Sequence, residues 1–324
     1  MKKKEIIARI IAILKEWKKD ERVDIELLLE ALDKLKNRRN ESILQFTKDT
    51  HLCRLTDGII FDDNEMDELL YNLIDDLKSF IRLKTIVGKD KIGYRKHFRG
   101  FIEESLDKKT PLDIISLNYD TCIEQFCDFH KKNYQDGFDL YWNKDAFNKA
   151  KTDIRLYKLH GSVIWYQSDN GAYIKLPIQN GSGELKLISG EKAENLMLYP
   201  MQKWDYAEPL LELLLHVKYL LESDIENDTQ EDLKSTANDF KFLIAVGYSF
   251  RDGHIKKIIL DSAKNNRKLY LIIIDPDANG IYERLKYYDN SREAESDLSG
   301  KMICLPYKFE GVFPYLTLTF LCRE

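Results

Sequence analysis

The sequence lacks several features that would assign the protein to a simple class. It has five cysteines at irregular spacing and no CxxC pair, which argues against a disulfide framework and a four-cysteine zinc site. Glycine and proline are sparse, at 15 and 7 residues, so long disordered stretches are not expected. No apolar run reaches the ~18 residues that a membrane-spanning helix needs. These absences predict a cytoplasmic protein with reduced thiols and no membrane contact.

A strong excess of either charge is also missing. The formal net charge is −5, with 32% charged residues, which gives no global attraction to nucleic-acid phosphates. We therefore expect no direct nucleic-acid binding. Residues 1–17 resemble a signal peptide only superficially, because Glu5, Arg9 and Lys15 interrupt the apolar run and no small-residue cleavage site follows. An amphipathic helix that packs on the rest of the protein is the better interpretation.

The first third of the chain, residues 1–110, predicts helices that pack on the core. Apolar side chains recur at helical spacing over residues 27–35 and again over residues 66–81, where Asn64 is a candidate N-cap. Residues 95–106 predict a third helix.

From residue 111 to 324 the pattern changes to alternating strands and helices. The most regular stretch runs strand, helix, strand, helix over residues 242–246, 254–264, 269–274 and 278–287. Earlier strands are expected at 112–117 and 154–159, and earlier helices at 121–129 and 209–222. This order predicts an α/β fold with right-handed crossovers, namely a Rossmann-like, doubly wound parallel sheet with a helical small module.

Residues 172–189 predict an inserted hairpin. The turn residues Asn180-Gly181-Ser182-Gly183 stand between its two apolar arms.

Polar residues follow four of the expected strands, at the strand ends where ligands bind in doubly wound folds. The four segments are Asn118-Tyr119-Asp120, His160-Gly161-Ser162, Gly247-Tyr248-Ser249 and Asp275-Pro276-Asp277.

The first two segments hold the candidate reactive groups. The amide of Asn118 suits a sugar hydroxyl or an amide ligand, or else forms an Asx turn that caps the next helix, a role open to Asp120 as well. The imidazole of His160 suits a general base near neutral pH, or else is a buried histidine with satisfied hydrogen bonds. Gly161 beside it allows close approach of the backbone.

The other two segments suit a nucleotide. Gly247 and Ser249 open a strand-to-helix turn, where glycine and free amides favour phosphate or ribose, while Asp252 is a candidate cap of the helix that follows. Asp275 stands where an acidic side chain often meets a ribose hydroxyl, or else is a turn residue, with Pro276 at the first helical position.

Together, these segments resemble motifs of the sirtuin-like family of bacterial NADases. Ser116 to Asp120, continuing to Glu124, is similar to the motif "TNYD..lE". Lys158 to Ser162 is similar to "KLHGS". Residues 245–252, with Ile255, are similar to "GYSF.D..I". Each motif is weak alone, but three in the right order at strand ends are fairly specific, and the resemblance covers residues 110 to 290.

The resemblance implies a Rossmann-like domain with NAD as its substrate, in a cleft beside a smaller helical module. Asn118 would orient the nicotinamide ribose and a water, and His160 would act as base on a ribose hydroxyl or water. Residues that would contact or support the nucleotide are Asp120, Gly161, Gly247, Ser249 and Asp275.

The implied activity is NAD glycohydrolysis, which yields nicotinamide and ADP-ribose, in antiphage defence. Such enzymes are usually homo-oligomers held inactive until a sensor protein triggers them. The alternatives are a non-catalytic nucleotide-binding or assembly domain and an ADP-ribosyltransferase.

The chain departs from the family in two respects. Sirtuin deacetylases carry a four-cysteine zinc module, whose absence here favours the NADase branch, and no metal is expected. The family also opens with a strand and a "GAG.S" loop that cradles the pyrophosphate. That motif is absent, and the first glycine is Gly58. The sequence therefore predicts a chain that begins after that loop, or a degenerate relative with weak NAD binding.

Overall fold

The structure is a computed structural model. It describes residues 2–18, 25–37, 63–88, 95–106, 111–149, 152–177, 184–186, 192–199, 208–223, 240–286 and 298–316.

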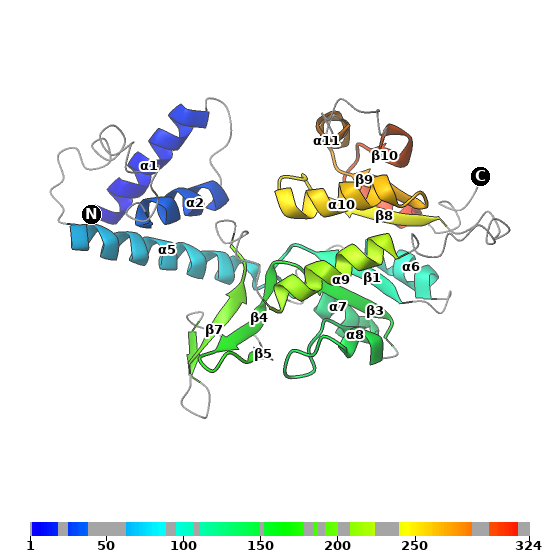
Figure 1. The fold of residues 1–324 in the computed structure, drawn as a ribbon, viewed down its shortest axis with the longest axis horizontal. Coiled ribbons are helices and arrows are strands. Elements are labelled where there is room, and N and C mark those ends of the chain that lie inside the picture. The colour runs from blue at the N-terminus through cyan, green and yellow to red at the C-terminus, as the bar shows by residue number, and fades with distance from the viewer. Residues whose placement is uncertain are drawn as a thin grey trace.

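Three amphipathic helices form a layer at the start of the chain, as the apolar stripes predict. They are α1 (Lys2–Lys18), α2 (Ile25–Lys36) and α5 (Asp63–Thr85), and they lie together at one end of the molecule (Figure 1). Their stripes are buried, with Leu29 and Leu32 fully enclosed. The prediction of Asn64 as an N-cap is wrong, because α5 already includes Asp63 and Asn64 lies in its first turn.

Six parallel strands form the α/β part, which confirms the predicted Rossmann-like fold class. They form two three-stranded sheets, ordered β1-β3-β2 and β10-β9-β8. The bounds are β1 Leu112–Ser116, β2 Tyr134–Gln135, β3 Ile154–Lys158, β8 Lys241–Val246, β9 Leu269–Ile274 and β10 Met302–Leu305. Among the described residues no hydrogen-bonded ladder joins β1 to β8, so the parallel strands form two sheets rather than one.

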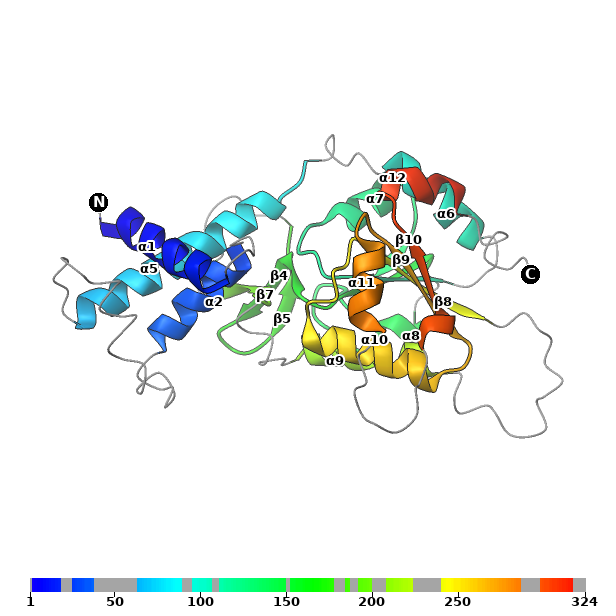
Figure 2. The ribbon, with the colours of Figure 1, turned by 90° about the horizontal axis from the view of Figure 1, so that it is seen from above.

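Helices pack against each parallel sheet. The helices of this part are α6 (Arg95–Leu106), α7 (Cys122–His130), α8 (Ala146–Lys149), α9 (Leu210–Glu222), α10 (Gly253–Asn265), α11 (Ala278–Leu285) and α12 (Phe309–Val312), with short 3-10 turns at Leu298–Lys301 and Phe313–Tyr315. Helix α6 contacts β1 and α9 contacts β3, while α10 contacts β9 and α11 contacts β10. Helices α9 and α10 lie side by side (Figure 2). Leu112 of β1 and Phe242 of β8 pack against one cluster that contains Phe101 and Phe313. The two sheets therefore border a common core.

Helix α6 has the predicted bounds, but it packs against β1 and the turn at Phe313–Tyr315. The division of the chain into a helical region 1–110 and an α/β domain 111–324 stays a proposal. None of the described helices is long and apolar enough to cross a membrane.

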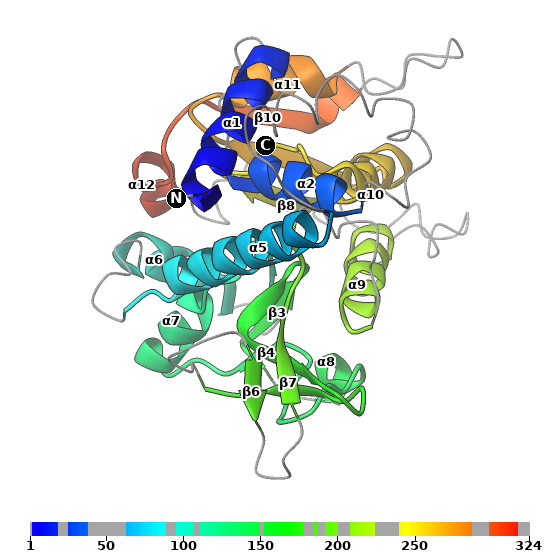
Figure 3. The same ribbon diagram turned by 90° about the vertical axis from the view of Figure 1, so that its left-hand side faces the viewer.

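A four-stranded antiparallel sheet adjoins the parallel ones, with order β5-β4-β7-β6. Its strands are β4 (Gly161–Ser168), β5 (Tyr173–Lys175), β6 (Glu184–Lys186) and β7 (Lys192–Met197). Helix α5 runs between this sheet and α2 (Figure 3).

The predicted hairpin over residues 172–189 is wrong, because β5 pairs with β4 and β6 pairs with β7. Its arms therefore lie at opposite edges of the sheet. A turn earlier in the chain joins β4 to β5 instead. In it, Asn170 accepts a hydrogen bond from the Ala172 amide at 3.0 Å, and Gly171 adopts φ +84°. The predicted turn Asn180-Gly181-Ser182-Gly183 lies outside the described residues.

Candidate functional site

Asn118 and His160 lie at the carboxyl ends of two neighbouring strands. Strands β1 and β3 pair in register up to Ser116 and Lys158, and the Leu159 amide donates to the Ser116 carbonyl at 3.1 Å. Asn118 and His160 each stand two positions beyond that last pair, so both leave the sheet at the same edge. The rings of Tyr119 and His160 are 6.3 Å apart between centroids.

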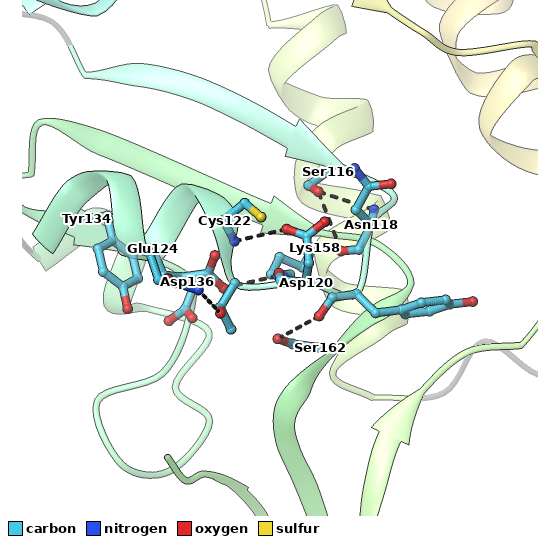
Figure 4. Close-up of polar contacts among 12 residues, drawn as sticks. Ser116, Asn118, Asp120, Cys122, Glu124, Tyr134, Asp136, Lys158 and Ser162 are labelled. Atoms are coloured by element: carbon cyan, nitrogen blue, oxygen red, sulfur yellow. Dashed lines mark hydrogen bonds and ion pairs between the residues drawn. The ribbon is translucent and has the colours of Figure 1, made fainter. Parts of the chain in front are cut away.

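The loop that carries Asn118 is held on both sides. The Tyr119 carbonyl accepts from the Val163 amide at 3.0 Å, and the Tyr119 hydroxyl donates to the Leu198 carbonyl at 2.7 Å. Asp120 accepts from the Cys122 amide at 2.9 Å, which forms an Asx turn directly before α7, whose N-cap is Thr121. The Asx turn before α7 is therefore formed by Asp120, while Asn118 is exposed beside Ser116 at the strand end (Figure 4).

A buried ion pair between Lys158 and Glu124 lies against this loop. Lys158, 1% exposed on β3, donates to Glu124 Oε1 at 3.0 Å and to the carbonyl of Asp120. Figure 4 shows the Lys158 side chain close to Asp120. Burial raises the pKa of the Glu124 carboxyl, and the positive charge of Lys158 opposes that rise. Lys158 therefore links α7 to the loop that presents Asn118.

His160 is buried and contacts the carboxylate of Asp252, which stands at the start of α10 beside the other parallel sheet. Its Nε2 lies 3.3 Å from Oδ2 of Asp252, and the two side chains are 9% and 3% exposed. Asp252 is also the N-cap of α10, as the sequence suggested. The contact joins the end of β3 to the start of α10.

The end of the second parallel sheet gathers the other candidate residues. The Gly247 amide donates to the Ile274 carbonyl at 3.0 Å, so Gly247 lies beside Asp275 at the ends of β8 and β9. Ser249 is exposed in the turn that follows. Asp275 accepts from the Asp277 amide at 2.7 Å and forms a turn before α11. Helix α11 begins at Ala278, so placing Pro276 at its first position is wrong by two residues.

A family model described as the SIR2-like domain matches residues 113–295, more than half of the chain. The chain belongs to the SIR2-like domain family. A search of curated proteins returned no match. Membership of the family indicates an NAD-related function, and the match includes all the strand ends described above.

Two glycines of this SIR2-like domain differ in what surrounds them. Both have positive φ, +81° at Gly161 and +62° at Gly247. A Cβ on Gly161 would collide with the carbonyl of Leu196, whereas one on Gly247 would meet nothing within 4 Å. Gly161 is thus required by the packing of β4 on β7, whereas Gly247 has open space around it at a strand end.

Exposed and buried polar groups gather at the strand ends of the SIR2-like domain. Asn118 and Ser249 offer accessible hydrogen-bonding groups, and the buried His160 lies between the two strand ends through its contact with Asp252. Within the described parts of the chain, no group of three His, Cys, Asp or Glu side chains is arranged to hold a metal ion.

Sequence reasoning did not identify Lys158 or Glu124 as part of the site, and it did not pair Asp252 with His160. Lys158 carried a usable signal, since a lysine within an apolar strand must find a buried partner. The pairing carried none, because His160 and Asp252 stand 92 positions apart.

Replacing Gly247 with alanine tests whether the space at this strand end receives the nucleotide. We expect the affinity for ADP-ribose, measured by titration calorimetry, to fall about tenfold, or ~1.4 kcal/mol, because the methyl group would occupy that space. The matched control is Gly171→Ala, which also has positive φ and open space but lies in the β4–β5 turn. Equal affinities in the two variants would show that Gly247 does not face the ligand.

Proposed function

We propose that the protein is an NAD glycohydrolase that cleaves NAD to nicotinamide and ADP-ribose. The observation that carries the proposal is the common edge from which Asn118 and His160 leave neighbouring strands. An amide and an imidazole on one side of a sugar can orient a water and take its proton. No metal is needed, because nicotinamide is already a good leaving group.

The reaction follows from the charge of the substrate. The bond between C1 of the ribose and the nicotinamide nitrogen breaks, and its electron pair leaves with nicotinamide, which becomes neutral. The ribose passes through an oxocarbenium-like state. Asn118 orients the ribose and the attacking water, and His160 accepts the proton that the water releases. The products are ADP-ribose, nicotinamide and one proton.

The remaining candidate residues support the nucleotide in this proposal. Gly247 and Ser249 contact the phosphates or the adenine-side ribose, and Asp275 is a candidate for that ribose too. Asp120 holds the loop of Asn118, and Gly161 allows β4 to start directly after His160. In this proposal these groups supply the anion contacts.

The biological part of the proposal is antiphage defence. We propose a homo-oligomer, controlled by a sensor protein, that hydrolyses cytoplasmic NAD when triggered. The similarity of the three motifs to bacterial NADases supports this role.

The test is to incubate the purified protein with NAD and to measure nicotinamide and ADP-ribose. Turnover should fall at least about 100-fold in His160→Ala and in Asn118→Ala, because each removes a group that acts on the reacting sugar. The matched control is His216→Ala, a histidine on α9 that contacts the Glu212 carbonyl away from the strand ends.

Three results would contradict the proposal. Full activity in both variants would exclude the assigned site. Transfer of labelled ADP-ribose to protein would instead favour the ADP-ribosyltransferase. Stabilisation by NAD without turnover would favour the non-catalytic binding domain.

A further inference from the structure

The contact between His160 and Asp252 joins two parts of the chain that no hydrogen-bonded ladder connects among the described residues. His160 stands two residues beyond the end of β3 in one parallel sheet, and Asp252 is the N-cap of α10 beside the other. Nε2 and Oδ2 are 3.3 Å apart, and both side chains are more than nine-tenths buried. A carboxylate at that depth is costly unless its oxygens are engaged.

Asp252 uses its two oxygens for different purposes. Oδ1 accepts from the amides of His254 at 3.1 Å and Ile255 at 3.2 Å, which caps α10. Oδ2 faces the imidazole. Serine, threonine or asparagine would cap the helix equally well, so the cap alone does not account for a buried carboxylate. The second oxygen does, through its contact with His160.

The contact fixes which ring nitrogen of His160 is basic. A carboxylate only accepts hydrogen bonds, so the nitrogen that faces it carries the proton. Nε2 of His160 is therefore the N–H nitrogen, and Nδ1 holds the lone pair. We propose that Asp252 is a positioning residue that holds His160 in this tautomer and presents Nδ1 to the substrate. This inference rests on the proposed glycohydrolase function.

In the reaction, Nδ1 takes the proton from the water as the water oxygen bonds to C1 of the ribose. The C1–nitrogen bond breaks, and its electron pair leaves with nicotinamide. His160 then becomes an imidazolium whose Nε2–H stays bonded to Asp252, so the buried carboxylate balances the new positive charge. The same contact keeps the end of β3 aligned with the turn that contains Gly247.

Two variants of Asp252 separate the cap from the positioning role. In Asp252→Asn the amide oxygen still caps α10, but the NH2 group donates toward His160 and forces the proton onto Nδ1. In Asp252→Ser the hydroxyl still caps the helix but is too short to reach the ring. The matched control is Asp261→Asn, which makes the same chemical change elsewhere on α10.

We expect kcat for NAD to fall at least about 100-fold in Asp252→Asn, with KM changed less than about threefold, while the melting temperature stays close to that of the unmodified protein. Asp252→Ser should lose kcat while retaining its melting temperature, and Asp261→Asn should keep both. Nitrogen-15 spectra of the histidines should show His160 protonated at Nε2 in the unmodified protein and at Nδ1 in Asp252→Asn.

The spectra distinguish failure of this inference from failure of the proposed function. A His160 protonated at Nδ1 in the unmodified protein, or an unchanged kcat in Asp252→Asn, would overturn the inference. An unmodified protein with the Nε2 proton but no turnover would refute the glycohydrolase while leaving the pairing intact. Loss of folding in Asp252→Ser as well as Asp252→Asn would assign Asp252 a structural role only.

Discussion

Replacing Lys158 with methionine is expected to lower the free energy of unfolding by about 3–5 kcal/mol. The ammonium group neutralises Glu124, which is 4% exposed, and it satisfies the carbonyl of Asp120. Methionine fills similar volume but leaves a carboxylate buried without its partner. Breaking a buried pair in this way costs far more than the pair itself contributes to stability. Urea unfolding of the two proteins measures the difference.

The loss of stability in Lys158→Met should depend on pH. The direction of that dependence follows from the raised pKa of Glu124. Burial already holds the pKa of this carboxyl above its ordinary range, and removing Lys158 removes the charge that opposes the rise. A carboxyl with a raised folded pKa gives stability that is complete below its unfolded pKa of about 4.3, and that stability is lost as pH rises through the folded pKa. The variant should therefore regain stability as the pH is lowered toward that value.

The double variant Lys158→Met with Glu124→Gln provides the control. It removes the unpaired carboxylate, so it should be more stable than Lys158→Met at neutral pH, and its pH dependence should be flatter. A single variant that is as stable as the unmodified protein at neutral pH would show that the pair does not anchor the loop.

Replacing Gly161 with alanine is expected to cost about 2–5 kcal/mol of stability, the sum of a left-handed backbone and an overpacked contact. Gly161 has φ +81°, and its added Cβ would collide with the Leu196 carbonyl on β7. The main chain of β7 can move only by disturbing its pairing with β4. Urea unfolding gives the cost.

Gly171→Ala isolates the contact from the backbone conformation. Gly171 has a similar φ of +84° but open space around it, so alanine there should cost only the conformational part, about 1–2 kcal/mol. Equal losses at the two positions would mean that β7 yields freely to the added methyl group.

Much of the α/β core could be predicted from the sequence, because apolar runs of strand length encode burial directly. Residues 242–274 gave two strands and a helix close to their observed bounds. The antiparallel sheet could not be predicted. Its strand β4 follows His160 immediately, and its partner β7 lies farther along the chain. The local pattern of apolar residues therefore does not indicate that these two strands pair. The hairpin predicted over residues 172–189 is wrong for the same reason, because the turn near Gly171 joins β5 to β4 instead.

The candidate site shows a similar division. Strand ends mark where ligands bind in this architecture, so Asn118, His160, Gly247 and Asp275 could be singled out one by one. Their relations required the fold. The register of β1 and β3 brings Asn118 and His160 to the same edge of the sheet, and only the approach of the two parallel sheets brings Asp252 to the imidazole. Neither of these spatial relations can be predicted from the spacing of the residues along the sequence.

One apolar cluster extends from Ile6 in α1 and Leu70 in α5 through Trp165 in β4 to Ile259 in α10. Buried side chains of the first helices and of the α/β layer therefore belong to one continuous cluster. Each supplies surface that the other buries, so neither reaches its full stability alone. Removal of the opening helices would therefore expose apolar side chains of this cluster to water and lower the stability of the rest of the molecule.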